Sequence, residues 1–180
     1  MRRLLILLTL ALLAGCTGVP QGLQTVRGFE PERYLGTWYE IARLDHAFER
    51  GLTDVTASYG RRPDGGIDVL NRGWDPAKGA WREARGRAFF LEDPNVASLK
   101  VSFFGPFYGG YHVFALDPHY RWALVSGPSR DYLWILARTP DLTEPLLLEL
   151  VDKARRAGID TDALVFPTHT RSRSGNGRGT

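Results

Sequence analysis

The chain has 180 residues, 43% of them hydrophobic and 24% charged, which suits one globular domain. A single cysteine excludes a disulfide framework and a metal site built from cysteines. Five of the 23 basic residues lie in the two terminal segments, 1–15 and 171–180, so acidic residues slightly outnumber basic ones in the body of the chain. This distribution excludes a nucleic acid as a partner, because binding one needs basic charge gathered on the folded domain.

The first residues have the pattern of an export signal. Arg2 and Arg3 precede an apolar run, residues 4–13, that is too short to cross a bilayer as a helix. Small residues follow the run. The pattern predicts a signal peptide over residues 1–15.

Residues 13–16 read Leu-Ala-Gly-Cys and resemble the lipobox of bacterial lipoproteins. The resemblance implies cleavage before Cys16, acylation of its sulfur and a lipidated tether over residues 16–28. The residue after Cys16 is Thr17, whereas an aspartate at that position would keep a lipoprotein from reaching the outer membrane. By the same resemblance, Thr17 implies sorting to the outer membrane. We expect a lipid-anchored protein that faces the periplasm. An ordinary signal peptide with an incidental cysteine is the alternative.

Eight β-rich runs separated by Gly, Pro and Asp clusters follow one another along the body of the chain. The expected strands are Trp38–Leu44, Thr53–Arg61, Ile67–Trp74, Trp81–Phe90, Leu99–Phe104, Tyr111–Leu116, Trp122–Ser126 and Tyr132–Arg138. Short connections favour consecutive antiparallel pairing, and the longest one, residues 45–52, does not have the character of a crossover between two sheets. Closure also removes exposed strand edges. The pattern therefore predicts an all-β fold, an eight-stranded antiparallel up-and-down β-barrel, rather than a sandwich.

The apolar period changes after Pro140. One helical face collects the apolar residues Leu146, Leu147, Leu150, Val151 and Ala154. The spacing predicts one C-terminal helix over about 143–157, packed outside the barrel and ended by Gly158. Residues 164–166 suggest a short edge strand. Residues 171–180 contain no apolar side chain and predict a disordered basic tail.

Short motifs in this order resemble the signatures of one family. Gly-Thr-Trp at residues 36–38 opens the strand series, as the first lipocalin signature does. Residues 99–111 are similar to the middle of bacterial lipocalins, and residues 132–138 resemble the third signature. The second signature departs from the family pattern, because only Tyr120 of residues 117–120 carries over.

The resemblance is to bacterial outer-membrane lipocalins of the apolipoprotein-D-like branch. It implies a lipocalin domain over residues 29–170. It also implies structural roles for four residues at a closed end of the barrel, Gly36, Trp38, Tyr120 and Arg138. In a closed barrel the first and last strands are neighbours, so an arginine and a tryptophan far apart in sequence can stack there.

The family registers Leu99, Val101 and Phe103 toward the interior, and strand alternation extends that register. The residues expected to line a ligand-binding lumen are Ala57, Tyr59, Val69, Asn71, Ala88, Phe90, Leu99, Val101, Phe103, Tyr111, Val113, Val125, Tyr132, Trp134 and Leu136. The family places the first loop beside the open mouth, and there we expect His46, Phe48 and Arg50. Packed core is the alternative for any one lumen position, and surface solvation is the alternative for the two polar mouth residues.

The expected function is storage or transport of lysophospholipids or fatty acids for cell-envelope maintenance, at a membrane held through acylated Cys16. The residues alone indicate only an apolar and slender ligand. No catalytic residue, metal or cofactor is expected, because the four histidines are scattered and the one thiol would carry lipid. Two alternatives stay open: a structural or partner-binding lipoprotein with a filled barrel, and a carrier of a retinoid or bilin. The oligomeric state also stays open, a homodimer included.

Overall fold

The computed structural model describes residues 17–171, so the predicted signal peptide, Cys16 and residues 172–180 of the predicted tail lie outside the described residues. The elements in chain order are α2 (Pro31–Tyr34), β1 (Gly36–Leu44), β2 (Thr53–Arg61), β3 (Ile67–Asp75), β4 (Ala80–Phe90), β5 (Ser98–Phe104), β6 (Phe107–Leu116), β7 (Trp122–Ser126), β8 (Leu133–Ala137), α3 (Glu144–Arg156) and β9 (Leu164–Val165).

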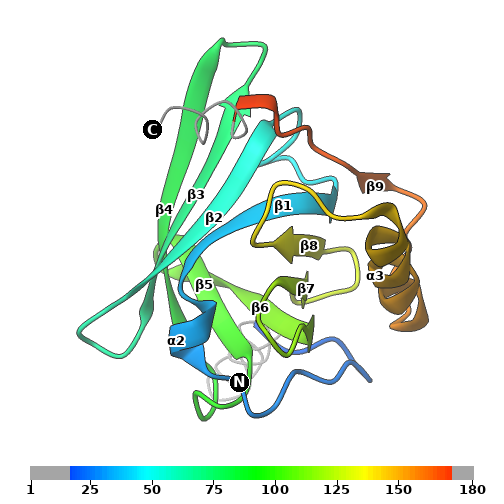
Figure 1. Ribbon diagram of the computed structural model, residues 1–180. Coiled ribbons are helices and arrows are strands. Elements are labelled where there is room, and N and C mark those ends of the chain that lie inside the picture. Colours follow the sequence, from blue (N-terminus) through cyan, green and yellow to red (C-terminus); the bar gives the residue numbers. More distant parts are fainter. Residues whose placement is uncertain (1–16, 172–180) are drawn as a thin grey trace, which may run out of the picture.

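The strands form one antiparallel sheet that curls round and closes on itself (Figure 1). Consecutive strands pair from β2 to β8, and β1 closes the ring by pairing with β2 along its first half and with β8 along its second. The short strand β9 pairs antiparallel with the last two residues of β1. The predicted eight-stranded up-and-down barrel is confirmed, and β9 is an addition outside the ring.

The helix α3 packs on the outside of the barrel, as predicted (Figure 1). Its apolar stripe recurs with the helical period, so one face can be buried while the other stays in water. Leu150 and Ala154 of that stripe are fully buried, Leu150 in a cluster with Leu124 and Ile135 of the barrel wall. Within residues 17–171, no helix has the length and apolar character needed to cross a membrane.

A tryptophan–arginine stack seals one end of the barrel. Trp38 is fully buried, and its indole N–H donates to the carbonyl of Tyr34 at 2.8 Å. The Arg138 guanidinium lies 3.9 Å from the centre of the Trp38 ring. Its terminal nitrogens donate to the carbonyls of Thr37 and Arg33 at 2.9 and 2.7 Å. These contacts tie β1, β8 and α2 together, so this end is closed.

The segment before β1 completes the closed end. The Tyr120 hydroxyl accepts a hydrogen bond from the backbone N–H of Glu30 at 2.8 Å, and the ring of Phe29 lies 6.1 Å from that of Tyr120. Gly36 has φ +91, a left-handed conformation that glycine adopts without strain. A Cβ there would stand 3.5 Å from Arg138, an ordinary contact distance, so the backbone conformation is what favours glycine.

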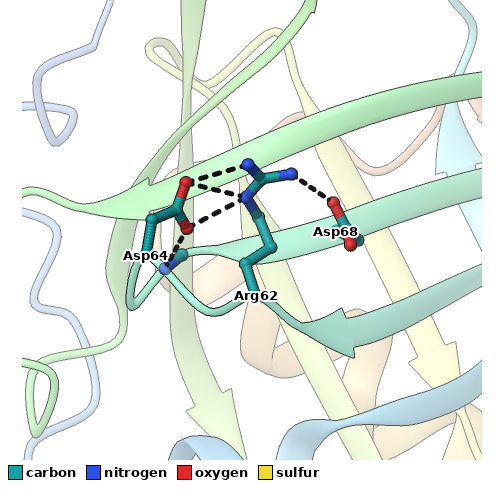
Figure 2. Close-up of polar contacts among 4 residues, drawn as sticks. Arg62, Asp64 and Asp68 are labelled. Atoms are coloured by element: carbon teal, nitrogen blue, oxygen red, sulfur yellow. Dashed lines mark hydrogen bonds and ion pairs between the residues drawn. The ribbon is translucent and has the colours of Figure 1, made fainter.

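The β2–β3 turn lies at the same end and is held by an arginine (Figure 2). Arg62 donates to Asp64 through two nitrogens and to Asp68 through a third, at distances of 2.6 to 3.2 Å. Asp64 also accepts from the backbone N–H of Gly66 at 3.1 Å. The Arg62 guanidinium is therefore engaged in the turn and is no free anion-binding group.

Several strands begin or end one or two residues from their expected bounds, and the largest difference lies at the start of β6. The strand β6 begins at Phe107 rather than Tyr111, because Gly109 and Gly110 pair with β5 in spite of their low intrinsic preference for strands. Arg171 was expected to begin the tail. Its guanidinium lies 4.0 Å from the centre of the Trp74 ring, so the packed chain continues through Arg171.

Candidate functional site

A cavity of about 670 Å³ occupies the interior between the closed end and the opposite, open end of the barrel. This volume lies within the range of roughly 300–1,000 Å³ typical of sites for small molecules. The predicted lumen residues that line it are Ala57, Tyr59, Val69, Asn71, Ala88, Leu99, Val101, Phe103, Tyr111, Tyr132 and Trp134. Most of this wall is apolar, as strand alternation predicts for a barrel interior.

Four other predicted lumen residues do not line the cavity. Val113, Val125 and Leu136 are buried in the main core cluster, and Phe90 packs against that cluster. These side chains lie within the barrel, but the core is filled around them. The cavity therefore occupies only the part of the barrel between this core and the mouth.

Three tyrosine hydroxyls form the polar part of the cavity wall near its floor. Tyr111 shares hydrogen bonds with Tyr34 at 2.7 Å and with Tyr59 at 2.8 Å. Burial raises the pKa of all three phenols, so they stay neutral. Tyr34 comes from α2 and was not expected in the lumen, since it precedes the first strand. The trio satisfies its hydroxyls internally and leaves the surroundings apolar.

The mouth residues divide into one that lines the cavity and two that do not. Phe48, from the β1–β2 connection, lines the cavity and is half exposed. His46 stacks on Tyr132 with ring centres 4.3 Å apart, and desolvation lowers its pKa. Arg50 donates to Asp45 at 2.6 Å on the surface. His46 and Arg50 therefore support the loop rather than face the cavity.

A buried charge cluster that was not predicted lies in the wall toward the mouth. Arg43 donates to the carboxylate of Glu40 at 2.6 Å and to the backbone carbonyl of Glu49 at 2.8 Å. The Trp134 indole donates to the Glu49 carboxylate at 3.0 Å. Glu40 and Glu49 line the cavity, and all three charged side chains are buried.

A bulge in β1 brings Arg43 inside. The register to β8 shifts between Glu40 and Ala42, so the alternation changes phase there and Arg43 falls on the interior face with Glu40. Ile41 and Ala42 both pack outward beneath α3. Two successive apolar residues before Arg43 are the sequence signal that could have suggested this change of phase.

Burial and, second, the neighbouring Glu49 raise the pKa of Glu40 to about 8, and the Arg43 guanidinium beside it only partly offsets this rise. Burial also raises the pKa of Glu49. The cluster thus carries less negative charge at neutral pH than two ionised carboxylates would. Within residues 17–171, no group of three or more His, Cys, Asp or Glu side chains is placed to hold a metal ion.

A closed barrel that surrounds an apolar cavity with one open mouth has the architecture of a carrier of small hydrophobic molecules. The family model described as a lipocalin-like domain matches residues 29–169. The chain belongs to the lipocalin family. Lipocalins are binding and transport proteins, so it is a binding protein and not an enzyme.

Curated relatives match most of the chain. The outer membrane lipoprotein Blc of Escherichia coli K12 is 54% identical over 147 residues, 82% of this chain and 83% of that protein. The protein of the same name from Vibrio cholerae is 50% identical over 167 residues, 92% of this chain and 98% of its own. Insecticyanin of the tobacco hornworm Manduca sexta has a similar fold, with a TM-score of 0.67 at 19% identity over 86% of this chain and 88% of that one.

Proposed function

We propose that this lipocalin is an outer-membrane lipoprotein, acylated at Cys16 and facing the periplasm, that stores or transports lysophospholipids or fatty acids for envelope maintenance. The observation that carries the proposal is the 670 Å³ cavity, apolar along most of its wall and open at one end. The names of the Blc relatives support the location.

The charges of the cavity wall favour one orientation of such a ligand. Glu40 and Glu49 are the buried charged residues among those that line it, and both are acidic. An anionic carboxylate or phosphate placed beside them would lose hydration without gaining a free cation. The acyl chain therefore enters first, and the headgroup stays at the mouth, where Arg72 and Arg82 line the cavity and are exposed.

Burial of the ligand's acyl chain in the cavity supplies enough free energy for binding. Each buried methylene contributes about 0.8 kcal/mol, and micromolar affinity needs about 8 kcal/mol. A single long acyl chain exceeds that sum before the cost of ordering it is subtracted. The open cavity disfavours the filled-barrel alternative. Carriage of a retinoid or bilin remains the second candidate.

The test is mass spectrometry of lipids that co-purify with the detergent-extracted protein, paired with a fluorescent lysophospholipid titration. Val101→Trp, which places a large ring in the cavity, is expected to weaken lysophospholipid binding at least about tenfold. Leu148→Trp is the control, because Leu148 is 61% exposed on α3, outside the barrel, and does not line the cavity. Equal affinity of the two variants would contradict the proposal, as would a retinoid or bilin as the recovered ligand.

A further inference from the structure

The β5–β6 hairpin carries two large aromatic residues in water at the mouth of the barrel. Phe104 is 80% exposed and Phe107 76% exposed, and the two are paired across the hairpin. Both also line the cavity, as does Phe48, which is 50% exposed on the β1–β2 connection. Adjacent aromatic residues left in water on a soluble domain mark a surface that contacts something apolar.

Positive charge flanks the same hairpin. A Cβ on Gly105, at the turn, would stand 3.8 Å from the Arg87 guanidinium, and Arg87 is exposed. The Lys100 ammonium lies 5.1 Å from the centre of the Tyr108 ring, one residue beyond Phe107. Aromatic side chains with basic residues beside them suit the surface of a bilayer that contains anionic lipids.

The N-terminal segment ends beside this hairpin. The Nε2 atom of His112 donates to the carbonyl of Gly18 at 3.0 Å, which ties the segment to the outer face of β6. A Cβ on Gly110 would stand 3.2 Å from the Thr17 carbonyl oxygen. Gly110 is three residues along β6 from Phe107, about 10 Å at the rise of a strand. The described chain therefore begins against the outer face of β6, nearer the hairpin than the closed end of that strand.

We propose that the mouth of the barrel docks on a lipid bilayer, with Phe104 and Phe107 inserted among the lipids and Arg87 and Lys100 against anionic headgroups. The direction of docking rests in part on acylation of Cys16, which belongs to the proposed function, whereas the aromatic surface does not. In this orientation a lipid passes between the leaflet and the cavity without crossing water.

The first test uses the chain from residue 16 to 180 with Cys16→Ser, so that no acyl anchor contributes. Flotation with vesicles of phosphatidylethanolamine and phosphatidylglycerol is expected to show binding that weakens with salt. The double variant Phe104→Ser/Phe107→Ser is expected to bind at least about tenfold less. Leu148→Ser/Phe166→Ser is the matched control, since these residues are 61% and 51% exposed but lie on α3 and after β9. Thermal unfolding establishes that each variant is folded.

Absence of vesicle binding by the chain with both phenylalanines intact would overturn the proposal. So would an equal loss in the control variant, or a loss of self-association in the Phe variant while vesicle binding persists, which would assign the surface to a second copy of the chain. These outcomes do not depend on a bound lipid, so they are separate from failure of the proposed function.

The second test measures orientation in the acylated full-length protein reconstituted into the same vesicles. Hydrogen exchange of residues 104–108 is expected to slow on reconstitution, relative to the protein in detergent-free solution after removal of the anchor. The turn at residues 117–121, between β6 and β7 at the closed end, is expected to exchange at an unchanged rate. Slowing at the closed-end turn alone would place that end on the membrane and overturn the proposal.

Discussion

The two ends of the barrel differ in how fully their buried polar groups are hydrogen-bonded. At the closed end, Arg138 donates hydrogen bonds to three backbone carbonyls and stacks on Trp38. At the open end, Arg43 donates to the carboxylate of Glu40 and to the backbone carbonyl of Glu49. Its Nε atom is buried without a hydrogen-bond partner among the described residues. The closed end is built for stability, whereas the open end keeps unsatisfied groups and exposed aromatic rings where a ligand and a surface would meet them.

Replacement of one tryptophan at each end gives the largest expected contrast. Trp38→Ala is expected to lower the free energy of unfolding by about 3–5 kcal/mol, because a fully buried ring leaves a cavity and Arg138 loses its stacking partner. Trp134→Ala is expected to lower it by only about 1–2 kcal/mol, since Trp134 already borders open space. Denaturant unfolding measures both, and equal losses would remove the distinction between the two ends.

The charge cluster at the open end predicts a pH dependence of stability. The folded-state pKa of Glu40 is about 8 against an ordinary 4.5, so the folded protein holds a proton there that the unfolded chain releases. The contribution of this proton is complete below pH 4.5 and is lost as the pH rises toward 8. Glu40→Gln, which stays neutral at every pH, is expected to remove most of that decline.

The measurement is the free energy of unfolding of wild type and Glu40→Gln between these two pH values. Glu83→Gln is the matched control, because Glu83 also lines the cavity but is exposed. An identical pH dependence of wild type and Glu40→Gln across this window would show that the pKa of Glu40 is not raised in the folded protein.

Arg138→Lys tests the closed end with a smaller change. A lysine keeps the charge but cannot donate to the carbonyls of Thr37, Arg33 and Tyr120 together, so a loss of about 1–2 kcal/mol is expected. The loss should not diminish in high salt, since the acceptors are neutral carbonyls. A salt-dependent loss in denaturant unfolding would point to an ion pair instead. Arg85→Lys, on the exposed face of β4, serves as the control.

Much of the barrel could be predicted because its strands end at Gly, Pro and Asp turns and alternate regularly between them. The strands Thr53–Arg61 and Trp122–Ser126 have the bounds that the sequence suggests. The helix predicted over 143–157 occupies 144–156, since its apolar period has no interruption. The start of β6 was placed late because pairing with β5 overrides the local preference of Gly109 and Gly110.

The interior of the open end could not be predicted in full, because it depends on a bulge and on a loop. Arg43 faces inward only because the β1 register shifts after Glu40. Glu49 reaches the cavity from the β1–β2 connection, where no strand period applies. Alternation placed Val113 and Val125 inside the barrel but could not reveal that neighbouring side chains fill the space around them. Ligand contact by the lining residues stays a prediction.

The position of β1 between β2 and β8 has a consequence for how the chain folds. The strand β1 comes first in the ring, but its second half pairs with β8, whose residues lie far along the chain. The ring therefore closes only when β8 pairs with β1. Such a non-local pairing is slow to form, and until it does the early strands present an open edge to other chains. The yield of refolded protein is therefore expected to fall as the protein concentration rises.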